Sequence, residues 1–236
     1  MQRLTLGGLD LCVTDPHPRD TQYIYDEIFV NQIYYHPEMR MRRHPVIVDV
    51  GANIGLFCVW AHRRYQPKDI YCFEASPRTF EFLKANAANL VDAGITTVHP
   101  INRPLARVAG QTLTLHQAPL ISGISTLLDQ SKVNWIQGLA ASGEIITHDV
   151  VTSTLSAEIA ANHIDVVDML KIDVEGYFME VLRGIADADL GKIRNVVVEI
   201  DYAAEAGANH RDVEDMLKTH GFHTDRDEDT FYAWRR

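Results

Sequence analysis

The sequence lacks the features of exported, membrane-spanning and nucleic-acid-binding proteins. Its three cysteines form no CxxC pair, which disfavours a disulfide framework and a zinc site and fits a reducing compartment. No apolar run approaches the roughly 18 residues of a membrane span, and the N-terminus has no signal-peptide core. The formal charge of −10 opposes broad contact with nucleic acid or an anionic membrane. We therefore expect a cytoplasmic protein with neither a nucleic-acid partner nor a membrane partner.

Signatures of bound metal and of repeats are also missing. The eleven histidines show no HxH or HExxH spacing, so no metal site is predicted. The composition, 46% hydrophobic and 23% charged over 236 residues, is ordinary for a globular protein and excludes disorder, collagen and coiled coils. These values predict one domain with one large core.

Short β-branched runs alternate with helix-like periods along most of the chain, which is typical of a parallel sheet with crossover helices. The expected strands are residues 46–50, 69–74, 96–101, 169–174 and 194–200, and the expected helices are residues 56–64, 76–87, 155–163, 177–183 and 210–220. Residues 111–116 are expected to pair beside the third strand as a hairpin. Residues 222–224 and 230–234 are expected to form a final antiparallel hairpin.

Two segments depart from this alternation. Residues 1–45 hold an aromatic cluster that consists of Tyr23, Tyr25, Phe29, Tyr34 and Tyr35. The cluster predicts either a helical cover over the site or simply packing. Residues 117–148 are rich in small polar residues and glycine, and they predict an irregular active-site segment.

The turn after the first strand indicates a cofactor site. Gly51 and Gly55 let a ligand approach the backbone where the helix amides face it, but Asn53 stands where a dinucleotide fingerprint has glycine. Glu74 ends the second strand, where a carboxylate can accept hydrogen bonds from both hydroxyls of a ribose. The pattern predicts a ribose-bearing cofactor without a pyrophosphate. The alternative is a glycine-rich turn followed by a solvent-exposed glutamate.

Four motifs in order resemble those of FkbM-type methyltransferases: residues 48–55, 73–77, 170–176 and 181–184. These enzymes use S-adenosylmethionine (SAM) on the class I Rossmann-like methyltransferase fold, and the resemblance covers roughly residues 25–201. It implies an α/β protein with a mostly parallel central sheet, helices on both faces and the antiparallel C-terminal hairpin. Residues 1–45 would then be the cover segment and residues 46–236 the SAM-binding domain.

The resemblance also implies an activity, which is O-methylation of a hydroxyl group on a natural product, sugar or lipid. Residues 27–35 are similar to versions associated with polyketide and nonribosomal peptide assembly, so the acceptor could be tethered to a carrier protein. The implied cofactor-binding residues are Asp49, Gly51, Ala52, Asn53, Gly55, Glu74, Ala75, Asn102 and Asp173.

Asp173 and Glu175 follow the fourth strand, at the sheet edge where ligands of open α/β folds bind. They could orient the acceptor hydroxyl, accept its proton or hold a divalent cation, although no metal site is predicted. Alternatively, they only complement the dipole of the next helix. His148 and His163 are further candidate bases, with surface residues as the alternative.

Lys171 and Glu199 are secondary candidates, the first as a structural partner of a carboxylate and the second as a group in the same layer as Asp173. Three other functions stay open: a NAD-linked oxidoreductase, a SAM-dependent N-methyltransferase and a cofactor-binding module without catalysis. The glycine spacing disfavours the first, the acidic site disfavours the second and the complete motif set disfavours the third.

Overall fold

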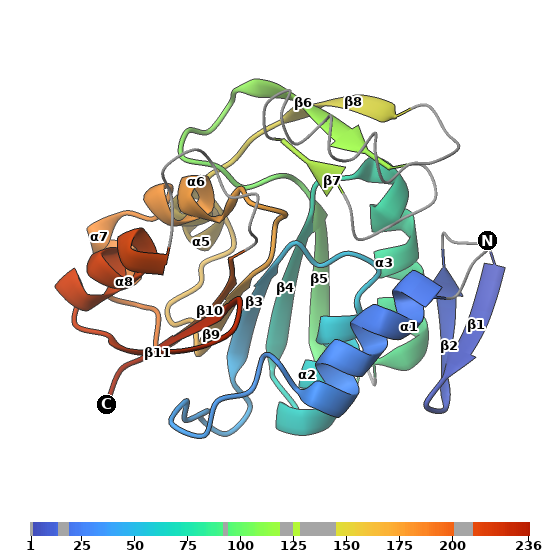
Figure 1. The fold of residues 1–236 in the computed structure, drawn as a ribbon, viewed down its shortest axis with the longest axis horizontal. Helices are drawn as coiled ribbons and strands as arrows, with labels where there is room; N and C mark the ends of the chain where they lie inside the picture. The colour runs from blue at the N-terminus through green and yellow to red at the C-terminus, as the bar shows by residue number, and fades with distance from the viewer. Residues whose placement is uncertain (1, 14–18, 92–93, 119–124, 128–144, 201–209) are drawn as a thin grey trace.

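The structure is a computed structural model, and it describes residues 2–13, 19–91, 94–118, 125–127, 145–200 and 210–236 (Figure 1). Its centre is a seven-stranded sheet with the order β11-β12-β10-β9-β3-β4-β5. The bounds are β3 (Val46–Val50), β4 (Asp69–Glu74), β5 (Thr97–Asn102), β9 (Met169–Ile172), β10 (Asn195–Glu199), β11 (His223–Asp227) and β12 (Thr230–Trp234).

The sheet confirms the predicted fold class. β5, β4, β3, β9 and β10 are parallel neighbours, and β12 runs antiparallel to both β10 and β11. The C-terminal hairpin and the mostly parallel sheet of the class I Rossmann-like fold are therefore both present. Strand order reverses between β3 and β9, because the chain leaves β3 toward β4 and β5 and returns on the other side.

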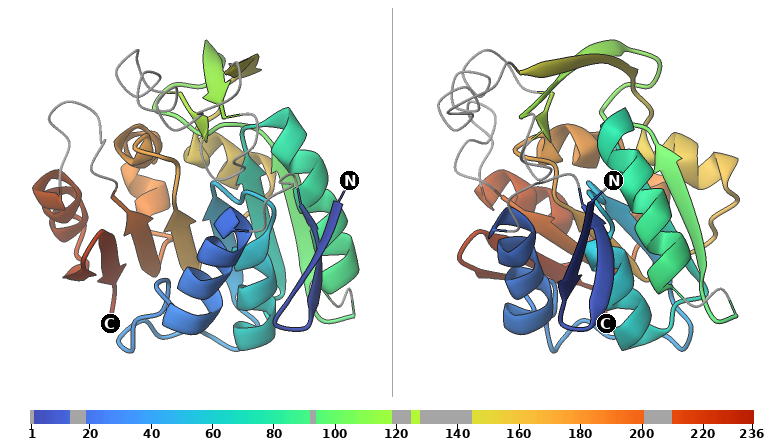
Figure 2. Two further views of the ribbon diagram at one scale, coloured as in Figure 1. Left: turned by 45° about the vertical axis from the view of Figure 1, so that its right-hand side comes forward. Right: turned by 90° about the vertical axis from the view of Figure 1, so that its right-hand side faces the viewer.

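Helices cover both faces of the sheet (Figure 2). One face carries α1 (Arg19–Tyr25), the π-helix η1 (Asp26–Asn31), α2 (Leu56–Tyr65) and α3 (Pro77–Leu90). The other carries α5 (Leu155–Ala161), α6 (Phe178–Arg183), α7 (Asp187–Leu190) and α8 (His210–Thr219). Because side chains alternate along a strand, Ile172 and Val198 pack toward α5–α8, whereas Met169 and Val197 pack toward α2 and α3.

Residues 2–13 form an antiparallel hairpin that the sequence analysis did not anticipate. β1 (Gln2–Leu6) and β2 (Leu9–Val13) are joined at Gly7 and Gly8, both with positive φ. The hairpin lies beside α3 at the outer end of the molecule (Figure 1), and Leu9 and Leu11 are fully buried there. The Gly-Gly pair between two apolar runs was the available signal.

A second, three-stranded sheet lies above the carboxyl ends of the central strands (Figure 1). Its order is β7-β6-β8, with β6 (Thr112–Gln117), β7 (Ser125–Thr126) and β8 (Ile146–Val151). The expectation that residues 111–116 pair beside the third strand was therefore wrong. β6 pairs with β8, from Thr112 opposite Val151 to Gln117 opposite Ile146.

The predicted irregular segment at residues 117–148 is also partly corrected, because it contains β7 and the start of β8. Residues 119–124 and 128–144 lie outside the described part of the chain. Such long-range antiparallel pairing leaves no local pattern, since each short strand looks like a loop until its partner is known.

Hydrogen bonds fasten the small sheet to the start of α3. The Ser76 hydroxyl donates to the Gln117 amide oxygen at 2.7 Å, and the Gln117 amide nitrogen donates to Thr79 Oγ1 at 2.9 Å. Ser76 also caps α3 by accepting from the Thr79 amide at 3.2 Å. Over the described ranges, no helix is long and apolar enough to cross a bilayer.

Candidate active site

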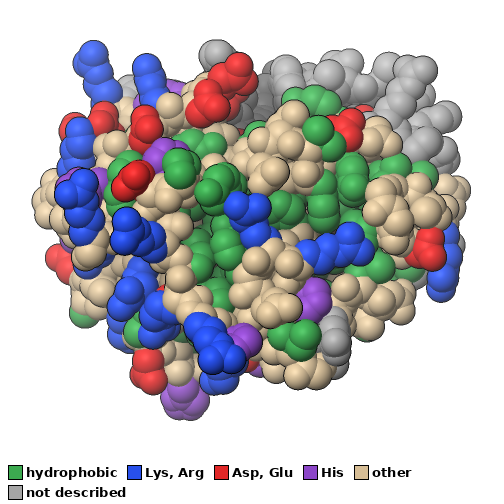
Figure 3. All heavy atoms as spheres, turned by 90° about the horizontal axis from the view of Figure 1, so that it is seen from below, with side chains coloured by type: hydrophobic (Ala, Val, Ile, Leu, Met, Phe, Trp, Pro, Cys, Tyr) green, Lys and Arg blue, Asp and Glu red, His purple; other side chains and the backbone are tan. Residues whose placement is uncertain are grey.

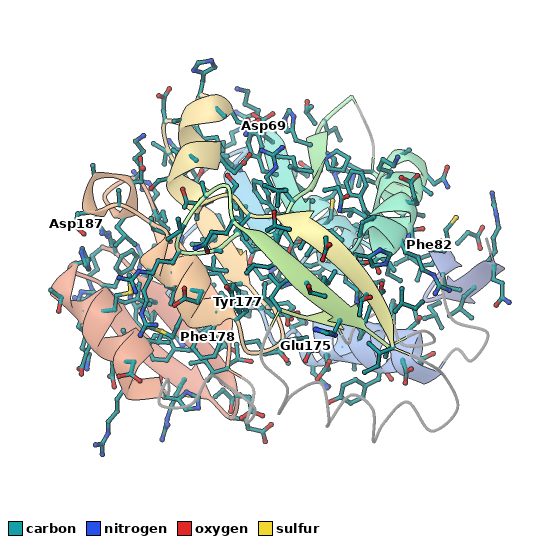
Figure 4. The ribbon with its side chains drawn as sticks, turned by 90° about the horizontal axis from the view of Figure 1, so that it is seen from above. Asp69, Phe82, Glu175, Tyr177, Phe178 and Asp187 are labelled. Atoms are coloured by element: carbon teal, nitrogen blue, oxygen red, sulfur yellow. The ribbon has the colours of Figure 1, made fainter. Side chains whose placement is uncertain are left out.

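A cavity of about 340 Å³ opens at the carboxyl ends of β3, β4, β9 and β10, where strand order reverses. This is the place at which open α/β sheets bind ligands, and the volume suits a small molecule. α1 and η1 supply one wall, and Leu115 of β6 lines the cavity from the small sheet. Figure 4, seen from above, shows Glu175 and Tyr177 near the middle of this edge, and both line the cavity.

The turn after β3 forms the floor of the cavity. The amides of Gly51 and Ala52 both donate to the Phe73 carbonyl, at 3.0 and 2.9 Å, which fastens the turn to β4. Gly51 has φ +79°, and a Cβ there would collide with the backbone carbonyl of Asp173. Gly51 is therefore required for the close approach of this turn to the end of β9.

Glu74 lies beside this turn, with both carboxylate oxygens facing backbone donors. Oε2 accepts from the Asn53 amide at 2.9 Å, and Oε1 accepts from the Ser76 amide at 2.8 Å. Burial raises the pKa of Glu74 to about 7, although these hydrogen bonds oppose the shift. Each oxygen keeps a further lone pair, so a cavity-lining Glu74 can still accept from hydroxyl donors on a ligand.

The remaining predicted cofactor residues differ in position. Ala52, Asn53 and Ala75 line the cavity, whereas Gly55 and Asn102 are outside its lining. Gly55 is the N-cap of α2. Asn102 donates its side-chain amide to the Glu74 carbonyl at 2.8 Å and so joins the ends of β4 and β5.

Asp49 is connected to the cavity residue Asp173 through Lys171. It is fully buried beneath the turn and lies outside the cavity lining. Its Oδ1 is 3.1 Å from the Lys171 ammonium, which also donates to the Gly51 carbonyl at 2.8 Å and lies 3.3 Å from Asp173 Oδ2. Burial disfavours the Lys171 ammonium, but Asp49 and Asp173 outweigh it and hold its pKa above the ordinary value. The lysine thus ties the glycine turn to Asp173.

Asp173 and Glu199 meet at the hydroxyl of Tyr34. The Tyr34 oxygen lies 3.0 Å from Asp173 Oδ2 and 2.8 Å from Glu199 Oε2. Tyr34 is buried, and its ring packs edge-on against Phe57 with centroids 5.3 Å apart. Burial, with the two carboxylates, raises the pKa of Tyr34 well above its ordinary value, so the phenol remains a hydrogen donor.

The other predicted catalytic residues are divided between the cavity and the rest of the fold. Glu175 lines the cavity from a left-handed backbone position, with φ +52°. His148 lies on β8 opposite Leu115, and His163 follows α5; neither lines the cavity. Among the described residues, no three His, Cys, Asp or Glu side chains group as a metal site would require.

Several cavity residues had no site role predicted from the sequence. Tyr34 appeared only within the aromatic cluster, and Tyr23 and Glu27 of the same segment also line the cavity. Burial raises the pKa of Glu27, against the effect of its hydrogen bond with Tyr23. The aromatic cluster was the signal, but nothing local indicated which ring would reach the sheet edge.

Comparison with known proteins gives this cavity a chemical context. A family model described as the methyltransferase FkbM domain matches residues 49–224. The chain is 32% identical over 229 residues to 31-O-demethyl-FK506 methyltransferase FkbM of Streptomyces tacrolimicus, covering 91% of this chain and 86% of that protein. It is 33% identical over 198 residues to Methyltransferase sdnD of Sordaria araneosa, covering 76% of this chain and 74% of that protein.

Two further similarities differ in extent. AMB antimetabolite synthetase AmbE of Pseudomonas aeruginosa is 29% identical over 204 residues, which cover 77% of this chain and 10% of the synthetase. Among solved structures, magnesium protoporphyrin IX methyltransferase of Synechocystis with bound SAM has a TM-score of 0.48 and 12% identity, covering 92% of this chain and 81% of that chain. From the family model and the relatives above 30% identity, the chain belongs to the FkbM methyltransferase family and is a methyltransferase.

Proposed function

We propose that this protein is a SAM-dependent O-methyltransferase that acts on a hydroxyl group of a small natural product or sugar, free or tethered to a carrier protein. The observation that carries the proposal is the buried, cavity-lining Glu74 carboxylate beside the Gly51 turn, with Asp173 lining the same cavity. This pairs a receptor for a ribose with a proton acceptor, as methyl transfer to a hydroxyl requires.

The cavity residues fit SAM better than a dinucleotide. Asn53 replaces the middle glycine of the dinucleotide fingerprint, and its amide already donates to Glu74 at 2.9 Å. A pyrophosphate therefore lacks the close backbone approach that it needs at this turn. Glu74 would hold the ribose hydroxyls, with Gly51, Ala52 and Asn53 along the cofactor. When bound, SAM supplies a methyl group that its sulfonium has already activated.

The chain's own residues then position and deprotonate the acceptor. Asp173 accepts the proton of the acceptor hydroxyl, and Lys171 holds the Asp173 carboxylate in place at 3.3 Å. Glu175 orients the acceptor at the same edge. Ile28, Phe57 and Leu115 line the cavity with apolar surface, which keeps water from the reacting atoms.

The relatives support an oxygen acceptor without identifying it. The name of the Streptomyces tacrolimicus protein describes methylation at an oxygen. The match to a short part of AmbE, a synthetase by name, supports an acceptor that is attached to a larger enzyme. An N-methyltransferase is the second candidate, but a neutral amine nucleophile has less need of the carboxylates Asp173 and Glu175.

The experiment that tests this proposal combines calorimetry with methyl transfer. We expect wild-type protein to bind SAM with 1:1 stoichiometry and to transfer a labelled methyl group to one member of a panel of hydroxylated natural products and sugars. Asp173→Asn should keep SAM affinity but lose about 10² to 10⁴ in rate, because the amide keeps the shape and loses the basic oxygen. Asp227→Asn, on exposed β11, is the matched control.

Three outcomes would contradict the proposal. NAD binding without SAM binding would exclude the cofactor, and SAM binding with labelled amines as the only products would favour N-methylation. Full activity in both Asp173→Asn and Glu175→Gln would remove the carboxylates from the reaction. Chelator treatment followed by added magnesium separates direct proton transfer, which is insensitive to both, from cation assistance.

A further inference from the structure

Tyr34 joins the ends of two central strands through one hydroxyl group. β9 and β10 are parallel neighbours with Ile172 paired to Val198, so Asp173 and Glu199 are the next residues at the same level of the sheet. Ile172 and Val198 face α5–α8, and Asp173 and Glu199 consequently point to the opposite face, where Tyr34 packs. The N-terminal segment thereby reaches the residue that the proposed function makes the base.

The hydroxyl has two oxygen neighbours but only one hydrogen. Distances of 3.0 Å to Asp173 Oδ2 and 2.8 Å to Glu199 Oε2 are both ordinary O–H···O lengths. Tyr34 can donate to one of these oxygens at a time. The other contact becomes a hydrogen bond only when that carboxyl group carries a proton and donates it to the phenol oxygen.

We infer that Asp173, Tyr34 and Glu199 form one acid–base unit, in which the Tyr34 hydroxyl transfers to Glu199 the proton that Asp173 takes from the acceptor. This inference rests on the proposed role of Asp173. As the acceptor's O–H bond breaks, its proton bonds to Asp173. Asp173 then gives a proton to the Tyr34 oxygen while the original Tyr34 hydrogen passes to Glu199. The phenol ends unchanged, and Glu199 holds the proton until solvent removes it.

The charges around the trio favour holding one proton. Lys171 lies 3.1 Å from Asp49 and 3.3 Å from Asp173, so a single ammonium balances the carboxylates at this level. The other titratable groups that line the same cavity, as far as the structure describes it, are Asp20, Tyr23, Glu27, Glu74, Arg103, Glu175 and Tyr177. Arg103 is a cation, but its guanidinium lies 3.3 Å from Glu158 Oε1 and is paired there. The carboxylates around the cavity still outnumber Lys171 and Arg103, so proton uptake relieves the repulsion among them.

Burial makes Tyr34 the connection between the two carboxyl groups. Tyr34 is 3% exposed, so its oxygen is shielded from exchange with bulk water. Its raised pKa, caused by burial and the two carboxylates, keeps the phenol from acting as a base itself. Tyr34 and Glu199 therefore act through Asp173, as positioning residues for its proton.

The first measurement requires no acceptor. In protein labelled with ¹³C at the tyrosine ζ carbons, we expect the Tyr34 resonance, assigned with Tyr34→Phe, to move in two steps as pH is lowered. Glu199→Gln and Asp173→Asn should each leave one step. Tyr35→Phe is the matched control, because that neighbouring ring is 39% exposed and contacts Arg64 instead. A Tyr34 resonance that ignores both substitutions would overturn the inference.

The second measurement uses the acceptor found in the methyl-transfer panel. Tyr34→Phe should lower kcat by about 10- to 100-fold, the loss typical of one hydrogen bond to a charged group, while SAM affinity stays unchanged. The acid limb of the kcat/KM profile should move to higher pH, which a purely structural role would not cause. An unshifted profile, or equal losses in Tyr34→Phe and Tyr35→Phe, would overturn it. If the wild type methylates no acceptor, the proposed function fails. The coupling of Asp173, Tyr34 and Glu199 is then still tested by the tyrosine resonance titration, which needs no acceptor.

Discussion

The proposed function places the cofactor ribose against Glu74, whose carboxyl group is buried beside the glycine turn. Its pKa is about 7 because of burial, against an ordinary 4.5. A group with a raised pKa in the fold stabilises the folded state at acid pH, and this contribution is lost as pH rises from 4.5 through 7. A ligand that donates hydrogen bonds to the carboxylate must first displace the proton.

This linkage predicts pH-dependent cofactor binding. We expect the affinity for the demethylated cofactor, S-adenosylhomocysteine (SAH), to fall below pH 7, by up to about tenfold per pH unit, because binding then releases a proton. Isothermal titration calorimetry between pH 5.5 and 8.5 measures this directly. Glu74→Gln should bind weakly without that slope, and Glu81→Gln, on the exposed side of α3, should match the wild type. The same slope in Glu74→Gln and wild type would disprove the assignment.

Gly51 is constrained by its neighbour as well as by its backbone angle. Gly51 and Gly110 share φ +79°, but a Cβ on Gly110 meets nothing within 4 Å, whereas one on Gly51 collides with the Asp173 carbonyl. A side chain at residue 51 would therefore point into the end of β9. Substitution of Gly51 should therefore lower the stability of the fold, whatever its effect on ligand binding.

The two glycines make a matched pair. Gly110→Ala should cost about 1–2 kcal/mol of unfolding free energy, the strain of a side chain at positive φ. Gly51→Ala should cost at least about 4 kcal/mol, because backbone must also shift. Urea unfolding followed by circular dichroism gives both values. Equal losses would show that the contact with Asp173 relaxes freely.

Asn86 connects three elements that are far apart in sequence. It is fully buried on α3 and accepts from the Cys12 amide at 2.6 Å. Its side-chain amide donates to the carbonyl oxygens of Cys12 at 2.9 Å and Ile54 at 2.8 Å. One side chain thus holds β2 and the turn before α2 against α3, and the turn is the floor of the cavity.

Removing this connection should destabilise the protein. Asn86→Ala leaves buried backbone groups without partners, and we expect a loss of about 3 kcal/mol or more. Asn89→Ala, on the exposed face of the same helix, should be neutral or slightly stabilising because alanine favours helix. Chemical denaturation measures both. A loss below about 1 kcal/mol for Asn86→Ala would mean that water replaces the missing amide.

At the scale of the whole molecule, charges of opposite sign gather at opposite edges of the sheet. The net charge is −10, yet the view from below shows lysine and arginine side chains spread over the amino ends of the strands (Figure 3). Arg40 and Arg43, which precede β3, and Arg63, near the end of α2, are exposed. At the carboxyl edge, the acidic residues around the cavity outnumber the cations Lys171 and Arg103; they are Asp20, Glu27, Glu74, Asp173, Glu175 and Glu199. The field at this edge favours a cationic cofactor such as SAM.

Cavity walls come from α1, η1, the central strands and the small sheet, so a ligand should stabilise the entire fold. At 100 times its Kd, SAH adds about 2.7 kcal/mol, which raises Tm by roughly 5–10 °C in a protein of this size. Differential scanning fluorimetry measures the shift, with NAD at the same concentration as the control. An equal shift with NAD would argue for a less selective nucleotide site.

The sequence by itself determined the central sheet and the part of the site that lies on it. Buried β-branched runs followed by helical periods specify each strand and crossover locally, and Gly51, Glu74, Asp173 and Glu175 occur at strand ends, which meet at one edge in any parallel sheet. These residues could be found because both the strand ends and the direction of the strands are properties of short segments.

Only the tertiary structure decided which distant segments complete the site. The pairing of β6 with β8 and the arrival of Tyr34 between Asp173 and Glu199 both join residues far apart in the chain. It also placed His148 and His163 outside the cavity lining. Such contacts depend on how whole elements pack. The local sequence of a short strand or a single tyrosine does not predict which distant residue it will contact.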